Sequence, residues 1–446
     1  MLNRTLNDWL EFISSVHANE IDLGLDRVLT VFNRLVENCK GEERRKFFLR
    51  PKKIITVAGT NGKGSTIALM EAGLLACGYT VGTYTSPHIC SYNERIHFNG
   101  SQIKDEQLVE SFQRINDLRV DIPLTYFEFG TLAALDVLLF SNLDVVILEV
   151  GLGGRLDAVN IIDADLSIIT SVDIDHTDWL GDSIEKIGVE KAGILRKNMH
   201  FLAGESLPES VFTRSRSLSC YQKEYHKDFG IEDDRGVFLS LDNKKYYFGE
   251  LPKLRIPKNN IMLALQAIAW CWSVLPAKKE VIKTNFDWPL IKTAFEQTAI
   301  PGRLEIVKGF NNVFLDVGHN AHAATFLMTF LKSLVIQGKK IQVVYSSLLD
   351  KDVDAIVEVL SPVVSAWFIA PLECDRAMPL SELEQKVGGK VKTMVSFPSV
   401  VKAIESAISK QTVMLNETRI ENDSLVTLVF GSFYIIETAK TYFEGL

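Results

Sequence analysis

From about residue 54 onward, the hydrophobic and polar residues follow two patterns in turn, one typical of buried strands and one typical of helices. Short runs that are nearly all apolar predict buried strands, and they are IITVA, TVGTYT, DVVILEV and LSIITSV. The segments between them have helical spacing, as in STIALMEAGLLACG and SIEKIGVEKAGILRK. This alternation predicts an α/β protein with a parallel sheet covered by helices on both faces. Ligands of such sheets bind at the carboxyl ends of the strands.

A second alternation of the same kind follows AIPGRLEIV. Its predicted strands are NVFLDVG, IQVVYSSL, VSAWFIAPL and SLVTLVFGS, with a last helix after them. The turn residues Pro301 and Gly302 lie where one series ends and the other begins. We therefore predict two domains, 1–299 and 300–446, and a cleft between them that suits a reaction joining two substrates.

One segment, residues 223–258, departs from both series. Within it GVFLSLDNKKYYFGEL predicts a polar hairpin, and NNIMLALQAIAWCW then resumes a helix with strong apolar periodicity.

The amino-acid composition excludes some classes of protein but does not identify the function. The hydrophobic fraction of 47% and the charged fraction of 23% are those of a folded globular protein. No run of about 18 apolar residues occurs, and the N-terminus lacks the apolar core of a signal peptide, so we expect a cytoplasmic protein that neither crosses nor binds a membrane. A net charge of −8 argues against nucleic-acid binding.

Six cysteines are spread through the chain without a C-x-x-C pair, which argues against a thiolate zinc site and a disulfide framework; they are Cys39, Cys77, Cys90, Cys220, Cys271 and Cys374.

The stretch TVAGTNGKGST, residues 56–66, combines a strand end, a glycine-rich turn and a helix start. A Walker A loop with Lys63 as its lysine requires glycine at 57 and a hydroxyl residue at 64, but the chain has Val57 and Gly64. The strict motif therefore fails. A lysine and unpaired backbone N–H groups still meet at the start of a helix, which we expect near Ser65. A tight βα connection with a solvated Lys63 is the alternative that these residues leave open.

Several further motifs follow in one order over residues 21–434: TSPHICSYNERI, TYFE, LEVGLGGRLDAVN, DIDHTDWLG, EKAG, PGR, DVGHNAHA and GSFY. Together with GTNGKGS they closely resemble the folylpolyglutamate synthase family, within the Mur-ligase-like ATP-dependent amide ligases. The resemblance implies an N-terminal domain with a doubly wound sheet like that of P-loop ATPases and a smaller Rossmann-like C-terminal domain. It also implies that the variant loop binds ATP through Thr60, Asn61, Gly62, Lys63, Gly64 and Ser65.

The stretch NEIDLGLDRV and the motif DHTDWLG resemble the bifunctional bacterial members. Those enzymes are implied to join L-glutamate to dihydropteroate, giving dihydrofolate, and then to lengthen the glutamate tail of reduced folates through acyl phosphates. A monofunctional folylpolyglutamate synthase is the alternative.

Glu149 ends the predicted buried strand DVVILEV, which would place a carboxylate at the edge where phosphates lie. Resemblance implies that it is a metal ligand, joined by Ser86 for one Mg²⁺ and by His176 for the other. It also implies that Lys191 is carbamylated, which requires a neutral and hence partly buried amine. A capping Ser86, an exposed Glu149, a His176 satisfied by the backbone and a solvated Lys191 are the alternatives.

The resemblance implies further contacts. Those to the pterin come from Ile21, Asp22, Leu23, Thr125, Tyr126, Phe127, Glu128, Leu156, Asp157 and Ala158. Acidic groups suit the donor-rich pterin edge, and because buried polar groups need partners we favour Thr125 and Glu128 as ligands. Further contacts to the nucleotide come from Asn260, Arg303 and Asp316. Lys63, Lys191 and His319 are the candidate catalytic residues, and Arg155, Asn320 and Ser432 are additional candidates for binding substrate anions.

Two other functions remain to be distinguished. A cell-wall Mur ligase shares the phosphate loop but needs an N-terminal nucleotide-sugar domain, for which the residues before Lys52 leave little room. A nucleotide-binding switch gives no reason for Glu149, His176 and Lys191 to occur together. We expect only small-molecule partners and a monomer.

Overall fold

The computed structural model describes residues 4–19, 21–38, 51–241, 244–276, 286–415, 418–421 and 424–445. The chain divides into two compact units, Met1–Thr298 and Ala299–Leu446. Cys39 lies outside the described residues, and Cys77, Cys90, Cys220, Cys271 and Cys374 are all free thiols.

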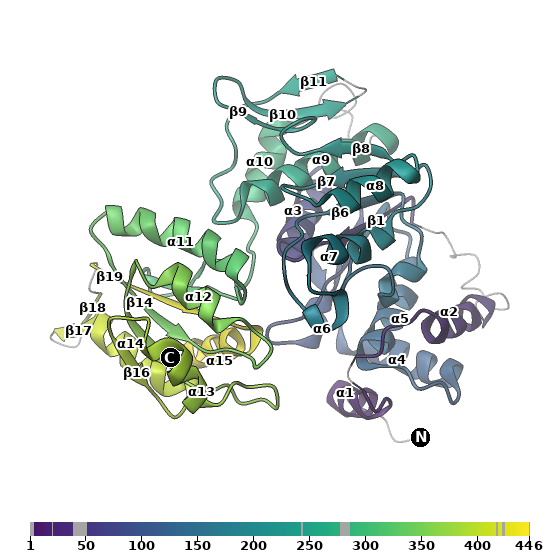
Figure 1. Ribbon diagram of the computed structural model, residues 1–446. Helices are drawn as coiled ribbons and strands as arrows, with labels where there is room; N and C mark the ends of the chain where they lie inside the picture. The colour runs from purple at the N-terminus through teal and green to yellow at the C-terminus, as the bar shows by residue number, and fades with distance from the viewer. Residues whose placement is uncertain are drawn as a thin grey trace. The chain divides into compact units, whose positions relative to one another are not determined.

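The first unit is built on an eight-stranded sheet in the order β4-β3-β2-β5-β1-β6-β7-β8 (Figure 1). Its strands are β1 (Lys53–Ala58), β2 (Val81–Tyr84), β3 (Ile96–Phe98), β4 (Ser101–Gln102), β5 (Val145–Glu149), β6 (Leu166–Ile169), β7 (His200–Ala203) and β8 (Tyr221–Glu224). Only β3 and β4 run antiparallel to their neighbours. Every residue of β5 and β6 is buried, so the centre of the sheet is covered on both faces.

Helices cover this sheet and build a second core beside it. They are α1 (Leu6–Ser15), α2 (Asp26–Asn38), α3 (Lys63–Ala76), α4 (Asp105–Arg119), α5 (Tyr126–Leu139), α6 (Thr177–Leu180), α7 (Ile184–Lys191), α8 (Glu209–Ser217), α9 (Lys258–Val274) and α10 (Trp288–Gln297). Helix α3 contacts both α9 and α10. Helices α1, α2, α4 and α5 share one hydrophobic cluster that contains Trp9, Val31, Phe112 and Phe129.

A small antiparallel sheet of β9 (Gly230–Glu232), β10 (Gly236–Leu241) and β11 (Lys244–Tyr247) contains the predicted hairpin. The antiparallel pairing of β10 with β11 confirms the hairpin, which β9 extends to three strands, but the prediction that the hairpin is polar is wrong for β10. Val237, Phe238 and Leu239 of β10 are buried, and Gln266 of α9 bonds to both the N–H and the carbonyl of Ser240. Only β11 is exposed along its whole length.

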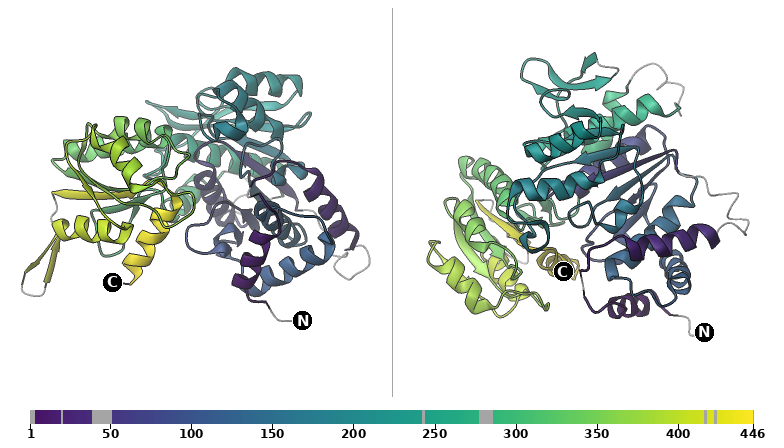
Figure 2. Two further views of the ribbon diagram at one scale, coloured as in Figure 1. Left: turned by 60° about the horizontal axis from the view of Figure 1, so that its bottom comes forward. Right: turned by 45° about the vertical axis from the view of Figure 1, so that its right-hand side comes forward.

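The second unit, which is green to yellow in Figure 2, has a six-stranded sheet in the order β12-β13-β19-β14-β15-β16. Its strands are β12 (Glu305–Ile306), β13 (Val313–Asp316), β14 (Lys340–Tyr345), β15 (Val364–Ile369), β16 (Met394–Ser396) and β19 (Leu425–Phe430). All except β12 are parallel. A separate hairpin pairs β17 (Thr412–Leu415) with β18 (Thr418–Glu421).

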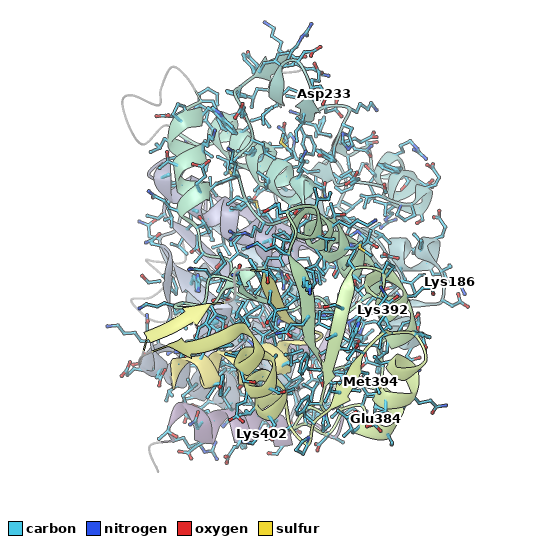
Figure 3. All side chains as sticks on the ribbon, turned by 90° about the vertical axis from the view of Figure 1, so that its left-hand side faces the viewer. Lys186, Asp233, Glu384, Lys392, Met394 and Lys402 are labelled. Atoms are coloured by element: carbon cyan, nitrogen blue, oxygen red, sulfur yellow. The ribbon has the colours of Figure 1, made fainter. Side chains whose placement is uncertain are left out.

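The helices found among the described residues of this unit are α11 (Ala321–Ile336), α12 (Val353–Leu360), α13 (Leu380–Gly388), α14 (Val400–Gln411) and α15 (Phe433–Glu444). Its core gathers large side chains from the sheet and from α11 to α13, with Tyr345, Trp367 and Phe430 in mutual ring contact. Lys392 and Lys402 of this unit, which Figure 3 labels, are both exposed. No helix within the described ranges is long and apolar enough to span a bilayer.

Candidate active site

The phosphate loop follows β1, the strand between β5 and β6. Gly59 has φ +153° and Gly62 has φ +88°. A Cβ on Gly59 would lie 1.9 Å from Oγ1 of Thr170, and one on Gly62 would lie 2.4 Å from Oδ1 of Asn260. Both positions therefore require glycine, because neighbouring side chains approach the backbone closely. The same contact places Asn260, a predicted ATP contact on α9, directly against the loop.

The loop ends where α3 begins, at Lys63. We expected the helix near Ser65, so the first turn starts two residues earlier and includes Lys63 and Gly64. Gly62 is the N-cap and provides no side-chain bond to the first turn, whose N–H groups are left for a ligand. Nζ of Lys63 donates to the Gly59 carbonyl at 3.0 Å and lies 3.9 Å from Oε1 of Glu149. This arrangement is a ready anion site.

The loop is fixed from the side of β6 by two residues that the sequence analysis missed. The Thr60 N–H donates to the Ser171 carbonyl at 2.9 Å, and the Asn61 N–H donates to Oγ of Ser171 at 3.1 Å. The Thr170 hydroxyl donates to the Asn61 carbonyl at 2.6 Å. The available signal was the pair of hydroxyl residues just past the apolar strand LSII, at the edge where ligands bind.

Glu149 is the last residue of β5 and is paired in register with Val57 of β1, so its carboxylate lies beside the phosphate loop. Its exposed fraction is only 4%, and Oε2 accepts the Ser86 N–H at 3.1 Å. The alternative of an exposed strand end is therefore wrong. Ser86 lies in the loop after β2 and is not a helix cap. The structure thus brings Lys63, Ser86 and Glu149 together.

Lys191, the last residue of α7, has an exposed fraction of 4%, so the alternative of a solvated surface lysine is wrong. Burial and, to a smaller extent, the charge of Lys63 lower its pKa to about 7, although Asp175 and Asp157 oppose the shift. A large share of the amine is therefore neutral near pH 7, as carbamylation requires.

His176 precedes α6 with φ +51°, and its Nε2 lies 4.0 Å from Oδ1 of Asp175.

The donor atoms at this site suit Mg²⁺ only if the phosphates of a nucleotide supply further oxygen ligands. In the part of the chain that the structure describes, no three His, Cys, Asp or Glu residues gather into a metal cage. Glu149 offers one buried carboxylate, Ser86 a hydroxyl and His176 an imidazole. Mg²⁺ is usually bound by one or two carboxylates, several waters and substrate phosphates rather than by an all-protein cage. The residues present suit Mg²⁺ carried by ATP.

Beside the phosphate loop lies a cavity of about 640 Å³. All ten residues that the resemblance implies for the pterin line it: Ile21, Asp22, Leu23, Thr125, Tyr126, Phe127, Glu128, Leu156, Asp157 and Ala158. Ser86 and His176 line it too, so the cavity reaches the residues proposed to hold the metal ions. The aromatic wall is formed by Tyr126 and Phe127, and Phe127 stacks on Tyr84 with ring centroids 6.3 Å apart.

Asp157 is a buried acid in this cavity. Its carboxylate accepts the N–H groups of Leu152 at 2.9 Å and Val159 at 3.0 Å. Burial raises its pKa to about 6 even though these N–H groups and the Lys63 charge oppose the shift. Near neutral pH the group is close to its titration range and can accept from, or share a proton with, a polar ligand.

Thr125 and Glu128 have partners within the protein, which corrects our reason for favouring them as ligands. The Thr125 N–H donates to Oε2 of Glu128 at 2.8 Å, and the Glu128 N–H donates to Oγ1 of Thr125 at 3.2 Å. The two form the capping box of α5. They line the cavity, but a ligand is not needed to satisfy them.

Two arginines near the cavity were missed by the sequence analysis. Arg95 lines it, is 7% exposed, donates through Nε to Nδ1 of His88 at 2.8 Å and lies over the ring of Tyr126. Arg27 bonds to both Asp22 and Glu128. Arg155, which we expected to bind a substrate anion, is instead paired with Glu190 at 2.9 Å on an exposed surface.

The second unit holds the remaining candidates. Asp316 is buried and accepts the N–H groups of Leu304 at 2.9 Å and Gly318 at 2.7 Å. Burial raises the pKa of Asp316, while the charge of Arg303 opposes the shift. Nδ1 of His319 lies 2.8 Å from the Val317 carbonyl.

Two other candidates of this unit serve as helix N-caps. Asn320 caps α11 by accepting the Ala323 N–H at 2.9 Å, and Ser432 caps α15 by accepting the Ile435 N–H at 3.1 Å. The side chains of both residues thus have a structural role of their own.

Comparison with known proteins identifies the family of this chain. Residues 302–423 match the model of the family described as "Mur ligase, glutamate ligase domain". The "Dihydrofolate synthase/folylpolyglutamate synthase" of Escherichia coli is 36% identical over 97% of this chain and 94% of its own. The chain belongs to the dihydrofolate synthase/folylpolyglutamate synthase family. It is thus a member of the Mur-type amide ligases, as the motifs predicted.

Solved structures of this family agree. E. coli FolC in complex with DHPP and ADP has a TM-score of 0.85 and 34% identity, with 99% of this chain and 98% of that chain covered. A bifunctional folylpolyglutamate synthase/dihydrofolate synthase with Mn, AMPPNP and L-glutamate bound has a TM-score of 0.82 and 34% identity at the same coverage. The predicted fold class is confirmed, and relatives of this chain bind an adenine nucleotide together with a divalent metal.

Proposed function

We propose that the protein uses ATP to join L-glutamate to dihydropteroate, giving dihydrofolate, and also adds glutamate to reduced folates. One observation carries this proposal. The cavity lined by Tyr126, Phe127 and Asp157 extends to Ser86, whose N–H bonds to Glu149 beside Lys63. A flat, polar-edged substrate in the cavity therefore has its carboxylate end near the site for the terminal phosphate of ATP.

The chemistry follows from the poor reactivity of a carboxylate toward an amine. An oxygen of the substrate carboxylate attacks the γ-phosphorus, the bond to ADP breaks, and an acyl phosphate forms. The neutral amine of glutamate then attacks the acyl carbon, loses a proton, and expels inorganic phosphate. The protein contributes mainly position and charge: the N–H groups that begin α3 and the Lys63 ammonium hold the phosphates, and the cavity walls exclude water from the acyl phosphate.

For the metal site, we propose that Glu149 and Ser86 hold one Mg²⁺, and that His176 and a carbamylated Lys191 hold a second. Magnesium bound there would neutralise phosphate charge during transfer. The low pKa of about 7 supports the carbamate, because the neutral Lys191 amine can add to CO₂ with loss of a proton.

Further nucleotide contacts are proposed for Thr60, Asn61, Gly62, Gly64, Ser65 and Asn260 in the first unit, and for Arg303 and Asp316 in the second. We propose His319 as a catalytic residue of the second unit.

Arg303 is a better test of the proposed nucleotide contacts than Asp316, since both oxygens of Asp316 already accept N–H groups. R303M should raise the KM for ATP about tenfold, whereas R376M, which removes an exposed arginine paired with Asp350, should leave it unchanged.

We also propose that the protein acts as a monomer in the cytoplasm. The phosphate loop and the described residues that line the cavity all belong to one chain, which supports a monomer. Sedimentation at micromolar concentration tests the oligomeric state.

Purified protein should release phosphate from ATP only when Mg²⁺, L-glutamate and a pterin substrate are all present. We expect this release with dihydropteroate and, separately, with tetrahydrofolate. Activity with tetrahydrofolate alone would leave a monofunctional folylpolyglutamate synthase. Activity with neither, while ATP still binds, would contradict the proposal and favour a cell-wall amino-acid substrate or a nucleotide switch.

A further inference from the structure

The segment between α1 and α2 forms one wall of the cavity. His17, Ala18, Asn19 and residues 21–24 of this segment line the cavity, while the start of α5 lines it from another side. This wall has no regular secondary structure of its own from residue 21 to residue 24. Some other contact must therefore hold it in place against α5.

Arg27, in the first turn of α2, provides that contact. Its Nη1 donates to Oδ2 of Asp22 at 2.7 Å, and its Nη2 donates to the Asp22 carbonyl at 2.7 Å. The same guanidinium reaches α5, where Nη2 lies 3.1 Å from Oε1 of Glu128 and Nε lies 3.3 Å from Oε2. One planar cation thus joins the cavity wall at Asp22 to the first turn of α5.

The Glu128 half of this bridge is shielded from water. The Glu128 side chain is only 5% exposed and that of Arg27 is 25% exposed, so water screens their interaction less than it screens a surface pair. Burial lowers the pKa of Arg27, but Glu128 and Asp22 outweigh this effect and leave the pKa raised. His17 adds a further bond at the wall, with Nε2 3.2 Å from Oδ2 of Asp22.

Arg27 does not line the cavity itself, so it can act only through the residues that it holds. We propose that Arg27 is a positioning residue for the pterin substrate, because it fixes the Asp22 wall and the Glu128 end of α5 at the separation that the ring system needs. This inference rests on the proposed function, since it presumes that the cavity binds the pterin. It assigns Arg27 no contact with ATP, glutamate or the reacting atoms.

Substitution of Arg27 should therefore change pterin affinity more than turnover. In R27M we expect the KM for dihydropteroate and for tetrahydrofolate to rise about tenfold or more, the size of effect that loss of a buried charge-assisted bond produces. The KM for ATP and kcat should stay within about threefold of wild type. In R27K the charge remains, but an ammonium cannot bond to both carboxylates in the plane of a fork, so partial rescue is expected.

Arg34 provides a matched control. It lies on the same helix, about two turns further along, and its Nη1 donates to the carbonyls of Leu118 and Arg119 outside the cavity. R34M makes the same substitution on the same helix and removes two hydrogen bonds to backbone carbonyls. Its KM for dihydropteroate should match wild type, even where its melting temperature falls as much as that of R27M.

A double-mutant cycle tests whether Arg27 acts through Glu128. R27M combined with E128Q should raise the KM for dihydropteroate by less than the product of the two single effects. A KM for dihydropteroate in R27M equal to that in R34M, or a fall in kcat alone, would overturn the inference. A wild-type protein that shows no pterin-dependent phosphate release would instead overturn the proposed function, so the two failures are distinguishable.

Discussion

At the scale of single residues, the site depends on close approach and burial. Neighbouring side chains leave no room for a Cβ on Gly59 or Gly62, and burial sets the protonation of Lys191 and Asp157. The sequence identified Gly62 and Lys191 as important but could not show these causes, since Thr170 and Asn260 are distant in the chain and burial depends on the whole fold. For the same reason it missed Arg27, although it named Asp22 and Glu128, the two carboxylates that Arg27 joins.

Substitution of Gly62 separates the effect of close contact with Asn260 from the effect of a positive φ alone. In G62A, a methyl group would meet the Asn260 side chain at 2.4 Å and the backbone would keep φ +88°, so we expect nucleotide affinity to fall at least tenfold and stability to fall by about 2 kcal/mol. G338A is the control, because Gly338 has φ +82° with nothing within 4 Å of an added Cβ. It should cost about 1 kcal/mol of stability and leave nucleotide affinity unchanged. Equal affinities in the two variants would contradict this account.

Lys191 should make stability depend on pH. Because burial lowers its pKa to about 7 in the folded protein, the unfolded chain binds more protons between about pH 7 and pH 10, and the free energy of unfolding rises with pH over that range. K191M has no such proton. In CO₂-free buffer, the free energy of unfolding of wild type should therefore rise by about 2 kcal/mol relative to that of K191M between pH 7 and pH 9. K191M should lack ligase activity.

Urea unfolding at several pH values measures this difference. K186M is the control, since Lys186 lies on the same helix, is labelled in Figure 3 and pairs with Asp182 at the surface. A pH-dependent difference in K186M as large as that in K191M, or a constant difference for K191M, would argue against a lowered pKa of Lys191.

At the scale of elements, the alternation of apolar strands and helices predicted most of the fold. It placed β1, β5, β6 and α3 because buried parallel strands and a helix of apolar residues have distinct patterns. It misjudged β10, where Val237 and Leu239 are buried on α9 and the small sheet although the surrounding residues are polar. Strand order was also beyond the sequence, since β1 lies between strands that follow it by many residues.

The capping box of α5 should link helix stability to substrate binding. T125A removes the hydroxyl that accepts the Glu128 N–H, so we expect a loss of about 1 kcal/mol and, because Thr125 lines the cavity, a higher KM for dihydropteroate. T5A removes the equivalent hydroxyl from the capping box of α1, which Thr5 forms with Asp8 away from the cavity. T5A should destabilise the protein to a similar extent without changing that KM. A KM that rises in both variants would point to stability alone.

At the scale of the whole molecule, each unit contributes its own part of a ligase. The first unit has the phosphate loop and the cavity, and the second includes the match to the glutamate ligase domain. The order of motifs along the chain was enough to predict this family. Most of them follow the carboxyl end of a strand, whereas TYFE begins α5, EKAG ends α7 and PGR precedes β12. The contents of the cavity wall could not be predicted in the same way, since its residues come from the α1–α2 segment, α5 and the turn after β5.

The central claim is that ATP activates the substrate carboxylate as an acyl phosphate. Dihydropteroate labelled with ¹⁸O in its carboxylate tests it most directly, with mass spectrometry of the phosphate released during one round of ligation to L-glutamate. If the carboxylate oxygen attacks the γ-phosphorus and leaves with it, one ¹⁸O atom should appear in each phosphate. Phosphate without ¹⁸O, released while dihydrofolate forms, would contradict the account.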